Sequence, residues 1–165
     1  MNLSDLLNED AISLSLKARD KESSIKELVQ LLESAHHVDT KGEILSKVLQ
    51  RESMMSTGIG NGVAIPHGKT RLLDQLVAAC GVSRAGIDFD SMDGEPATLF
   101  ILLVSPENLR GPHVKALANV SRLLKEESVR DALRASESPA GFLATLREAE
   151  AHFLRMEPTS PQPPG

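Results

Sequence analysis

The chain has 165 residues, of which 41% are hydrophobic and 25% are charged, so it is long enough and apolar enough for one globular domain with a substantial core. Its net charge of −5 and the lack of a Lys/Arg-rich run argue against a nucleic-acid partner. Trp and Tyr are absent, which leaves few candidates for recognition of bases or sugars by stacking.

The cellular compartment can be predicted from the number of cysteines and from the length of the apolar segments. A single cysteine, Cys80, excludes an internal disulfide framework, and its place in an apolar run favours a buried structural thiol in a reducing compartment. No apolar run is long enough to cross a bilayer, and the N-terminus lacks the pattern of a signal peptide. We therefore expect a cytoplasmic protein without direct membrane insertion.

The N-terminal segment predicts a strand followed by a helix. Residues 11–16 alternate apolar and polar side chains, which is typical of a half-buried strand. Residues 21–35 change to the helical period, and Ser24 and Glu27 have the spacing of a capping box.

A second helix is predicted from Thr40 and Glu43, which repeat the capping-box spacing, to about residues 51–52. His36 and His37 lie in the connection between the two helices. A third ligand at a sensible spacing is missing, so a solvated loop is favoured over a metal pair.

Residues 56–70 read Ser-Thr-Gly-Ile-Gly-Asn-Gly-Val-Ala-Ile-Pro-His-Gly-Lys-Thr and form the most informative stretch of the chain. Three alternating glycines permit sharp turns and close approach, and residues 63–65 read as a short buried strand. Pro66 restricts the backbone immediately before His67. The stretch thus predicts one imidazole held at the end of a strand, and imidazole is suited to nucleophilic attack or proton transfer near neutral pH.

Two nucleotide-binding motifs come close to matching this stretch and fail at the same position. Gly68-Lys69-Thr70 resembles the end of a P-loop, but the opening glycine of that motif would have to occupy the position of Val63. The pair Gly58 and Gly60 would need its third glycine at the same place. The glycines therefore do not predict ATP or NAD as a cofactor.

The second half of the chain predicts two buried strands and then helices. Residues 76–82 and 97–104 are apolar runs, and the latter is predicted to be a central strand, with turns or an edge segment near residues 86–89 and 93–94 between them. Gly111-Pro112 is predicted to open a helix, with proline at its first position.

Two further helices are predicted near residues 126–135 and 138–154. Strands interleaved with helices indicate a single layered domain over residues 1–154, of the α/β class or at its border with α+β. Residues 155–165 are rich in proline and polar side chains, and we expect them to form a disordered tail.

Two residues extend His67 into a candidate site. His113 falls in the first turn of the helix opened by Pro112, where free N–H groups and the helix dipole favour an anion. Arg51 is the nearest basic residue before the glycines, and a guanidinium can bind phosphate bidentately. The three side chains describe a site for a phosphoryl group on His67. The residues alone equally allow an Arg51 that only caps its helix and a His113 that only packs.

A resemblance to a known family decides between these interpretations. Glu52, six further residues and the string Ile-Gly-Asn-Gly-Val-Ala-Ile-Pro-His-Gly resemble the active-site signature of the fructose/mannitol-type IIA domains of the bacterial sugar phosphotransferase system. The string from Ser56 to Lys69 is especially similar to the nitrogen-regulatory IIA branch. The likeness extends from about residue 3 to residue 154.

The resemblance implies a fold, a chemistry and partners. The fold would be a mixed β-sheet flanked by helices on both faces. The family histidine that matches His67 receives the phosphoryl group, and the family's arginine and second histidine fall on Arg51 and His113. An HPr-type phosphocarrier protein would be the donor, and neither a metal nor a nucleotide cofactor is needed because that donor is already activated.

Three roles remain open for such a carrier. A regulatory IIA protein would bind its target according to its phosphorylation state. A transport component would pass the phosphoryl group to a fructose/mannitol-type permease IIB subunit. A protein of another class, a binding module without transfer, would not need the intact set of His67, Arg51 and His113.

Overall fold

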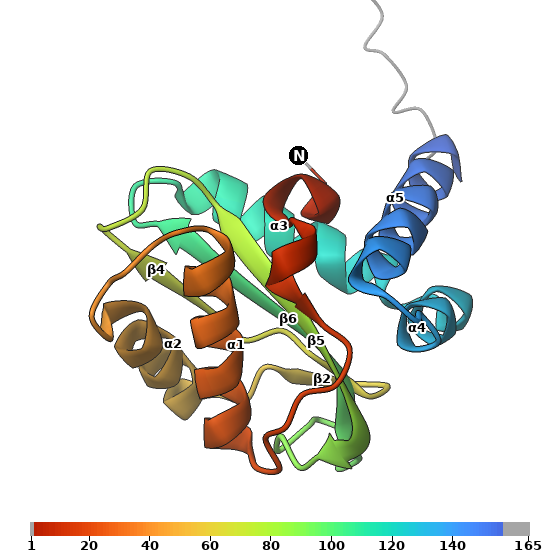
Figure 1. Cartoon of the computed structure of the whole chain (residues 1–165), viewed down its shortest axis with the longest axis horizontal. Helices are drawn as coiled ribbons and strands as arrows, with labels where there is room; N and C mark the ends of the chain where they lie inside the picture. Colours follow the sequence, from red (N-terminus) through yellow and green to blue (C-terminus); the bar gives the residue numbers. More distant parts are fainter. Residues whose placement is uncertain (1, 157–165) are drawn as a thin grey trace, which may run out of the picture.

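The computed structural model describes residues 2–156, with the side chains of the last three excepted (Figure 1). The described residues form one six-stranded mixed sheet whose strands follow the order β1-β5-β6-β3-β2, with β4 also paired to β6. The strands are β1 (Ile12–Ser13), β2 (Gly58–Gly60), β3 (Val63–Ala64), β4 (His67–Thr70), β5 (Val77–Ile87) and β6 (Ala97–Pro106).

Strand β6 is the centre of the sheet, as its apolar run predicts. It pairs antiparallel with β5 along one side. Along its other side it pairs parallel with β3 and then, further on, with β4, so that β3 and β4 follow one another along the same edge. Residues 99–105 of β6 are almost fully buried, which is the pattern of a strand covered on both faces.

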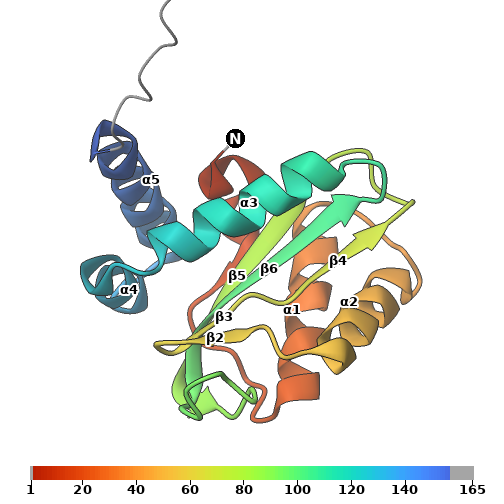
Figure 2. The ribbon, with the colours of Figure 1, turned by 180° about the vertical axis from the view of Figure 1, so that it is seen from behind.

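Helices cover both faces of this sheet. In Figure 1, α1 and α2 lie in front of the strands, and the reverse view in Figure 2 shows α3 crossing the opposite face, with α4 and α5 at the side. The predicted mixed sheet with helices on both faces is therefore confirmed. The helices are α1 (Lys21–Ala35), α2 (Glu43–Met54), α3 (Arg110–Leu123), α4 (Glu127–Arg134) and α5 (Pro139–Met156), preceded by the 3-10 turns η1 (Leu3–Leu6) and η2 (Glu9–Ala11).

The bounds of α1 match the prediction, but its cap does not. Asp20 precedes the helix in an extended conformation and accepts a hydrogen bond from the backbone N–H of Ser23 at 2.8 Å. Ser24 already lies in the first turn, where its hydroxyl donates to the carbonyl of Lys21. A capping residue must stand outside the helix, so the Ser24–Glu27 capping box was wrong.

The cap of α2 also differs from the prediction. Gly42 occupies the N-cap position with a φ of 90°, and the hydroxyl of Thr40 accepts from the backbone N–H of Ile44 at 3.2 Å. The carboxylate of Glu43 instead accepts from the hydroxyl of Thr70, which ties α2 to β4. The helix continues to Met54, three residues beyond Arg51.

Several other boundaries move because of pairing or turn geometry. The strand expected over residues 11–16 shrinks to β1, since η2 occupies the chain up to Ala11. Strand β5 extends to Ile87 through an irregularity at which Gly86 has a φ of +81°, so part of the expected turn is strand. Helix α5 continues to Met156, and the rest of the predicted tail, residues 157–165, lies outside the described residues.

Two predictions about individual side chains have different outcomes. Cys80 is fully buried on β5, as expected, and burial raises the pKa of its thiol. His36, expected in a solvated loop, is half-buried at the end of α1, and its Nε2 lies 2.9 Å from the carbonyl oxygen of Ala78. That contact fastens the end of α1 to β5.

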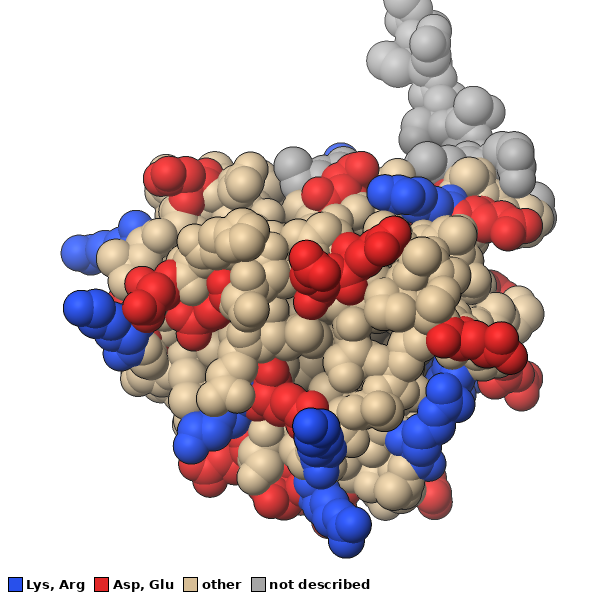
Figure 3. Space-filling view, viewed as in Figure 1, with Lys and Arg blue, Asp and Glu red and all other residues tan. Residues whose placement is uncertain are grey.

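The face formed by α1 and α2 carries acidic and basic side chains interspersed (Figure 3). Among the helices in the described part of the chain, none combines the length and apolar character that a bilayer span requires.

Candidate active site

His67 begins β4 and lines a hollow of about 470 Å³ at the edge of the sheet. Side chains alternate along a strand, and here His67 and Lys69 are half-exposed while Gly68 and Thr70 are buried. Helix α2 packs against β4, and α3 supplies the wall on the other side of the hollow. The hollow is lined by Lys47, Gln50, Arg51, Met54, His67, Gly68, Lys69, Glu107, His113, Val114 and Leu117.

Two glycines of the central stretch are required by their local geometry, and one of them, Gly68, directly follows His67. Gly62 turns the chain with a φ of +75°, and a Cβ there would lie 2.5 Å from Nη2 of Arg134. Gly68 permits close approach, because a Cβ would lie 3.0 Å from Cγ2 and 3.2 Å from the backbone nitrogen of Val48. The small residue after His67 thus lets α2 sit directly against β4.

The ring of His67 is held in one tautomer. Its Nδ1 lies 2.9 Å from the carbonyl oxygen of Ile65. A carbonyl oxygen can only accept, so Nδ1 carries the hydrogen and donates it. Nε2 then carries the lone pair, which makes it the nucleophilic atom of the ring.

The surroundings of His67 keep this ring neutral. Burial lowers its pKa below the ordinary value of 6.5, and the nearby charges of Arg51 and Lys69 lower it further. The hydrogen bond to Ile65 and the charge of Glu52 act in the opposite direction. Because the net shift is downward, Nε2 is unprotonated at neutral pH.

His113 faces His67 from α3, as the sequence predicts, with ring centroids 5.4 Å apart and planes inclined by 56°. Its residue is 3% exposed, and its Nδ1 is hydrogen-bonded to the hydroxyl of Ser105 on β6. Burial, together with the charges of His67 and Lys69, lowers the pKa of His113 to about 4. A neutral imidazole has one donor and one acceptor nitrogen, so His113 can form a hydrogen bond to a group placed between its ring and that of His67.

The helix N-terminus expected beside His113 plays a smaller part than predicted. Helix α3 begins at Arg110, which makes Pro112 its third residue and His113 its fourth. The side chains of His113, Val114 and Leu117 line the hollow, but residues 110–112 do not. The wall from α3 therefore consists of side chains and not of the free N–H groups of its first turn.

Arg51 both caps its helix and lines the hollow, so the two interpretations of this residue are compatible. Its Nη1 donates to the carbonyl oxygen of Met55 at 2.8 Å. That contact uses one of five N–H donors, which leaves most of the guanidinium for a ligand. The charge of Arg51 also lowers the pKa of His67, as expected for two residues that line the same hollow.

Two lysines of the wall were missed by the sequence reasoning. Lys69 follows His67 by two residues on a strand and so shares its face. Lys47 precedes Arg51 by four residues on α2, and such a pair shares one side of a helix. Once β4 and α2 are placed, both spacings indicate a positive wall around His67. Glu107 also lines the hollow, but its carboxylate is paired with Arg71 at 2.8 Å.

The lowered pKa of His113 predicts a loss of stability in acid. The unfolded chain binds a proton near pH 6.5, whereas the folded chain resists it until about pH 4, so the free energy of unfolding falls as pH falls through this window. The shift corresponds to up to about 3 kcal/mol. Urea unfolding at pH 7 and pH 4.5 should show a smaller pH dependence for His113→Gln than for the wild type. Equal pH dependence in the two proteins would contradict the burial argument.

Comparison with known proteins assigns the chain to a family. Residues 5–149 match the family model described as phosphoenolpyruvate-dependent sugar phosphotransferase system, EIIA 2. The match covers most of the chain, so the chain belongs to the EIIA type-2 family.

Individual relatives place it more closely. It is 35% identical over 150 residues to the nitrogen regulatory protein of Bradyrhizobium diazoefficiens, covering 88% of this chain and 95% of that protein. It is 37% identical over 148 residues to the fructose-specific EIIABC component of Bacillus subtilis, but that match covers 90% of this chain and only 23% of the longer protein.

A solved structure agrees with the sequence relatives. The crystal structure of the nitrogen regulatory protein IIA-Ntr from Neisseria meningitidis superposes with a TM-score of 0.80 at 30% identity, over 87% of this chain and 97% of that one. The predicted resemblance to the nitrogen-regulatory IIA branch, and with it the EIIA type-2 fold, is confirmed.

Proposed function

We propose that the chain is a phosphohistidine carrier that accepts a phosphoryl group on Nε2 of His67 from an HPr-type phosphocarrier protein. The observation that supports this most directly is the tautomer of His67, because the hydrogen bond from Nδ1 to Ile65 leaves Nε2 as the free nucleophile. A ring held in this way needs no deprotonation before it attacks.

The transfer step exchanges one nitrogen–phosphorus bond for another. The lone pair of His67 Nε2 forms a bond to phosphorus in line with the bond to the donor's imidazole nitrogen, and that nitrogen leaves with the bonding pair. Positive charge develops on the His67 ring, where the Nδ1–H group donates to the Ile65 carbonyl. Arg51, Lys69 and His113 stabilise the oxygens of the group in flight, which is the main contribution a protein makes to phosphoryl transfer.

The positive wall also suits the phosphorylated state. The chain as a whole carries a net charge of −5, yet Lys47, Arg51 and Lys69 surround the hollow. A phosphoryl group on Nε2 would lie among these cations, which offset the repulsion expected from the net negative charge of the chain.

We assign the carrier a regulatory role in the cytoplasm, in which phosphorylation of His67 decides which protein it binds. The match to a nitrogen regulatory protein over 95% of that protein's length supports this role. In this role the partner is a regulatory target that is bound according to the phosphorylation state of His67, and no further phosphocarrier is needed.

A second function is favoured by the match to a sugar-specific component. The similarity to the fructose-specific EIIABC component suits a IIA unit that passes its phosphoryl group to a permease IIB subunit. A binding module that has lost transfer is less well supported, because the arrangement around His67 keeps a free nucleophile beside cations.

A phosphoryl-transfer assay followed by protein capture tests the carrier function and distinguishes the regulatory role from the transport role. We expect a radiolabelled phosphoryl group to pass from an HPr-type protein to this chain, and the phosphorylated and unphosphorylated forms to capture different proteins from a lysate of the source cells. Onward transfer of label to a IIB subunit would favour the transport role. A chain that takes no label from any HPr-type donor would refute the carrier function.

A further inference from the structure

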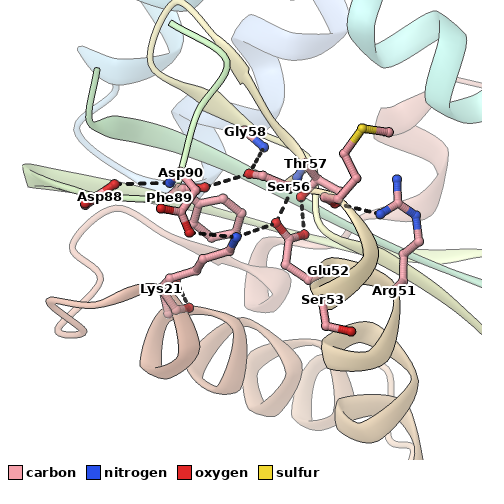
Figure 4. Close-up of polar contacts among 12 residues, drawn as sticks. Lys21, Arg51, Glu52, Ser53, Ser56, Thr57, Gly58, Asp88, Phe89 and Asp90 are labelled. Carbon is pink, nitrogen blue, oxygen red and sulfur yellow. Dashed lines mark hydrogen bonds and ion pairs between the residues drawn. The ribbon is translucent and has the colours of Figure 1, made fainter. Parts of the chain in front are cut away.

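Glu52 is a carboxylate buried close to the site without lining it. Its residue is 6% exposed at the end of α2, and it accepts hydrogen bonds from both the backbone N–H, at 2.8 Å, and the hydroxyl of Thr57. Figure 4 shows that Glu52 and its neighbour Arg51 lie on different sides of the helix, with Glu52 directed toward Thr57. Nη1 of Arg51 donates instead to the carbonyl oxygen of Met55. A buried charge is costly unless it is paired, so this arrangement requires an explanation.

A short series of hydrogen bonds leads from Glu52 to the nucleophile. Glu52 holds Thr57, whose carbonyl oxygen accepts from the backbone N–H of Ile65 at 3.0 Å. The carbonyl oxygen of Ile65 in turn accepts from Nδ1 of His67 at 2.9 Å. The atom that fixes the tautomer of His67 therefore belongs to a peptide segment whose position is set by Thr57.

The other side of Glu52 is anchored by Lys21, the first residue of α1. Nζ of Lys21 lies 3.0 Å from Glu52, 3.4 Å from Asp90 and 4.9 Å from the centroid of the buried Phe89 ring (Figure 4). The hydroxyl of Ser56 donates to the carbonyl oxygen of Phe89 at 2.6 Å. The start of α1, the end of α2 and the connection between β5 and β6 thus converge on the segment before β2.

We propose that Glu52, paired with Lys21, is a positioning residue that sets the orientation and tautomer of His67 through Thr57 and Ile65. This inference rests on the proposed phosphoryl transfer to His67 and adds a residue that touches neither the phosphoryl group nor the ring. Glu52 acts on His67 through the backbone carbonyl groups of Thr57 and Ile65. It can therefore orient the reacting ring although its own carboxylate does not line the hollow.

Charge gives Glu52 a second influence on the same ring. Its carboxylate raises the pKa of His67, in opposition to Arg51 and Lys69. His113 also faces the ring. As the His67 ring gains positive charge during attack, a buried carboxylate behind it favours that charge, whereas the cations of the wall act on the phosphoryl oxygens.

The variant Glu52→Gln tests this role because it removes the charge and keeps the shape. We expect the rate of phosphoryl transfer to His67 to fall about tenfold to a hundredfold, since a small misplacement of a nucleophile has a cost of this size. In ¹⁵N spectra of the imidazole, the share of the Nδ1–H tautomer should fall, and the pKa of His67 should move down.

Glu33→Gln is the matched control. Glu33 accepts from the backbone N–H of Thr40 at 2.9 Å and from the Thr40 hydroxyl at 3.1 Å, so it makes the same two contacts with a threonine away from the hollow. This variant should keep the wild-type rate and the wild-type spectrum of His67. Equal effects of the two variants would show that Glu52 only stabilises the fold.

Thr57→Val provides a milder variant in case Glu52→Gln folds poorly, because it removes only the hydroxyl contact. It keeps the charge of Glu52, so it should lower the share of the Nδ1–H tautomer by a smaller amount and leave the pKa of His67 nearly unchanged. Unchanged signals and an unchanged rate in a folded Glu52→Gln protein would overturn the inference while leaving the carrier function intact. Failure of the wild type itself to accept the phosphoryl group would instead refute the proposed function.

Discussion

His67→Ala is expected to abolish phosphoryl transfer from an HPr-type donor, with no label above background in a gel assay. The variant removes the only atom to which we assign attack on phosphorus, Nε2, and the remaining wall of the hollow has no replacement for it. We expect His113 not to substitute, because its residue is only 3% exposed and because its Nε2 must carry the proton, and not the lone pair, to donate to the phosphoryl oxygens as proposed. Labelling of the alanine variant at the wild-type rate would place the acceptor elsewhere in the chain.

The fold should survive this substitution. His67 is half-buried, and its described hydrogen bond goes to the Ile65 carbonyl, so the expected loss of stability is about 1 kcal/mol. His36→Ala is the matched control, because His36 is also half-buried and also contacts a backbone carbonyl, that of Ala78, at 2.9 Å. It should lose similar stability and keep full labelling.

The elements that periodicity predicted correctly are those whose burial is regular. The apolar run of β6 is covered on both faces, and α1 has one buried stripe, so each pattern matched a single structure. The caps and boundaries were predicted less well because they depend on local backbone conformation. Gly42 at the cap of α2 and Gly86 within β5 both have positive φ, and the spacing of side chains does not indicate this.

The candidate site was predicted only in part, because some of its residues have a local signal in the sequence and others depend on how distant elements pack. His67 could be identified from its own neighbours. His113 and Arg51 could be proposed from their chemistry and their places in the chain, and a family resemblance decided between a functional and a structural role for them. The contributions of Lys47 and Lys69 depend on α2 packing against β4 at the edge of the sheet, which is a long-range arrangement. The series from Glu52 through Thr57 and Ile65 depends on backbone carbonyls, and these carry no signal in a sequence.

Arg51→Ala is expected to slow phosphoryl transfer about a hundredfold, the usual cost of removing one charged or hydrogen-bonding group that stabilises a transition state. Arg51 lines the hollow with His67 and retains N–H donors beyond the one that contacts Met55. The expected measurement is a single-turnover transfer rate at saturating donor. Arg51→Lys should give an intermediate rate, because an ammonium keeps the charge but lacks the planar fork.

Arg130→Ala separates the catalytic role of Arg51 from its structural one. Arg130 also lies near a helix end, where its Nη1 donates to the carbonyl oxygens of Leu124 at 3.0 Å and Lys125 at 2.7 Å. Its loss removes a comparable contact with a helix end outside the hollow, so we expect reduced stability with an unchanged transfer rate. If Arg51→Ala behaves in the same way, the guanidinium only closes α2, and stabilisation of the phosphoryl oxygens must come from Lys47, Lys69 and His113.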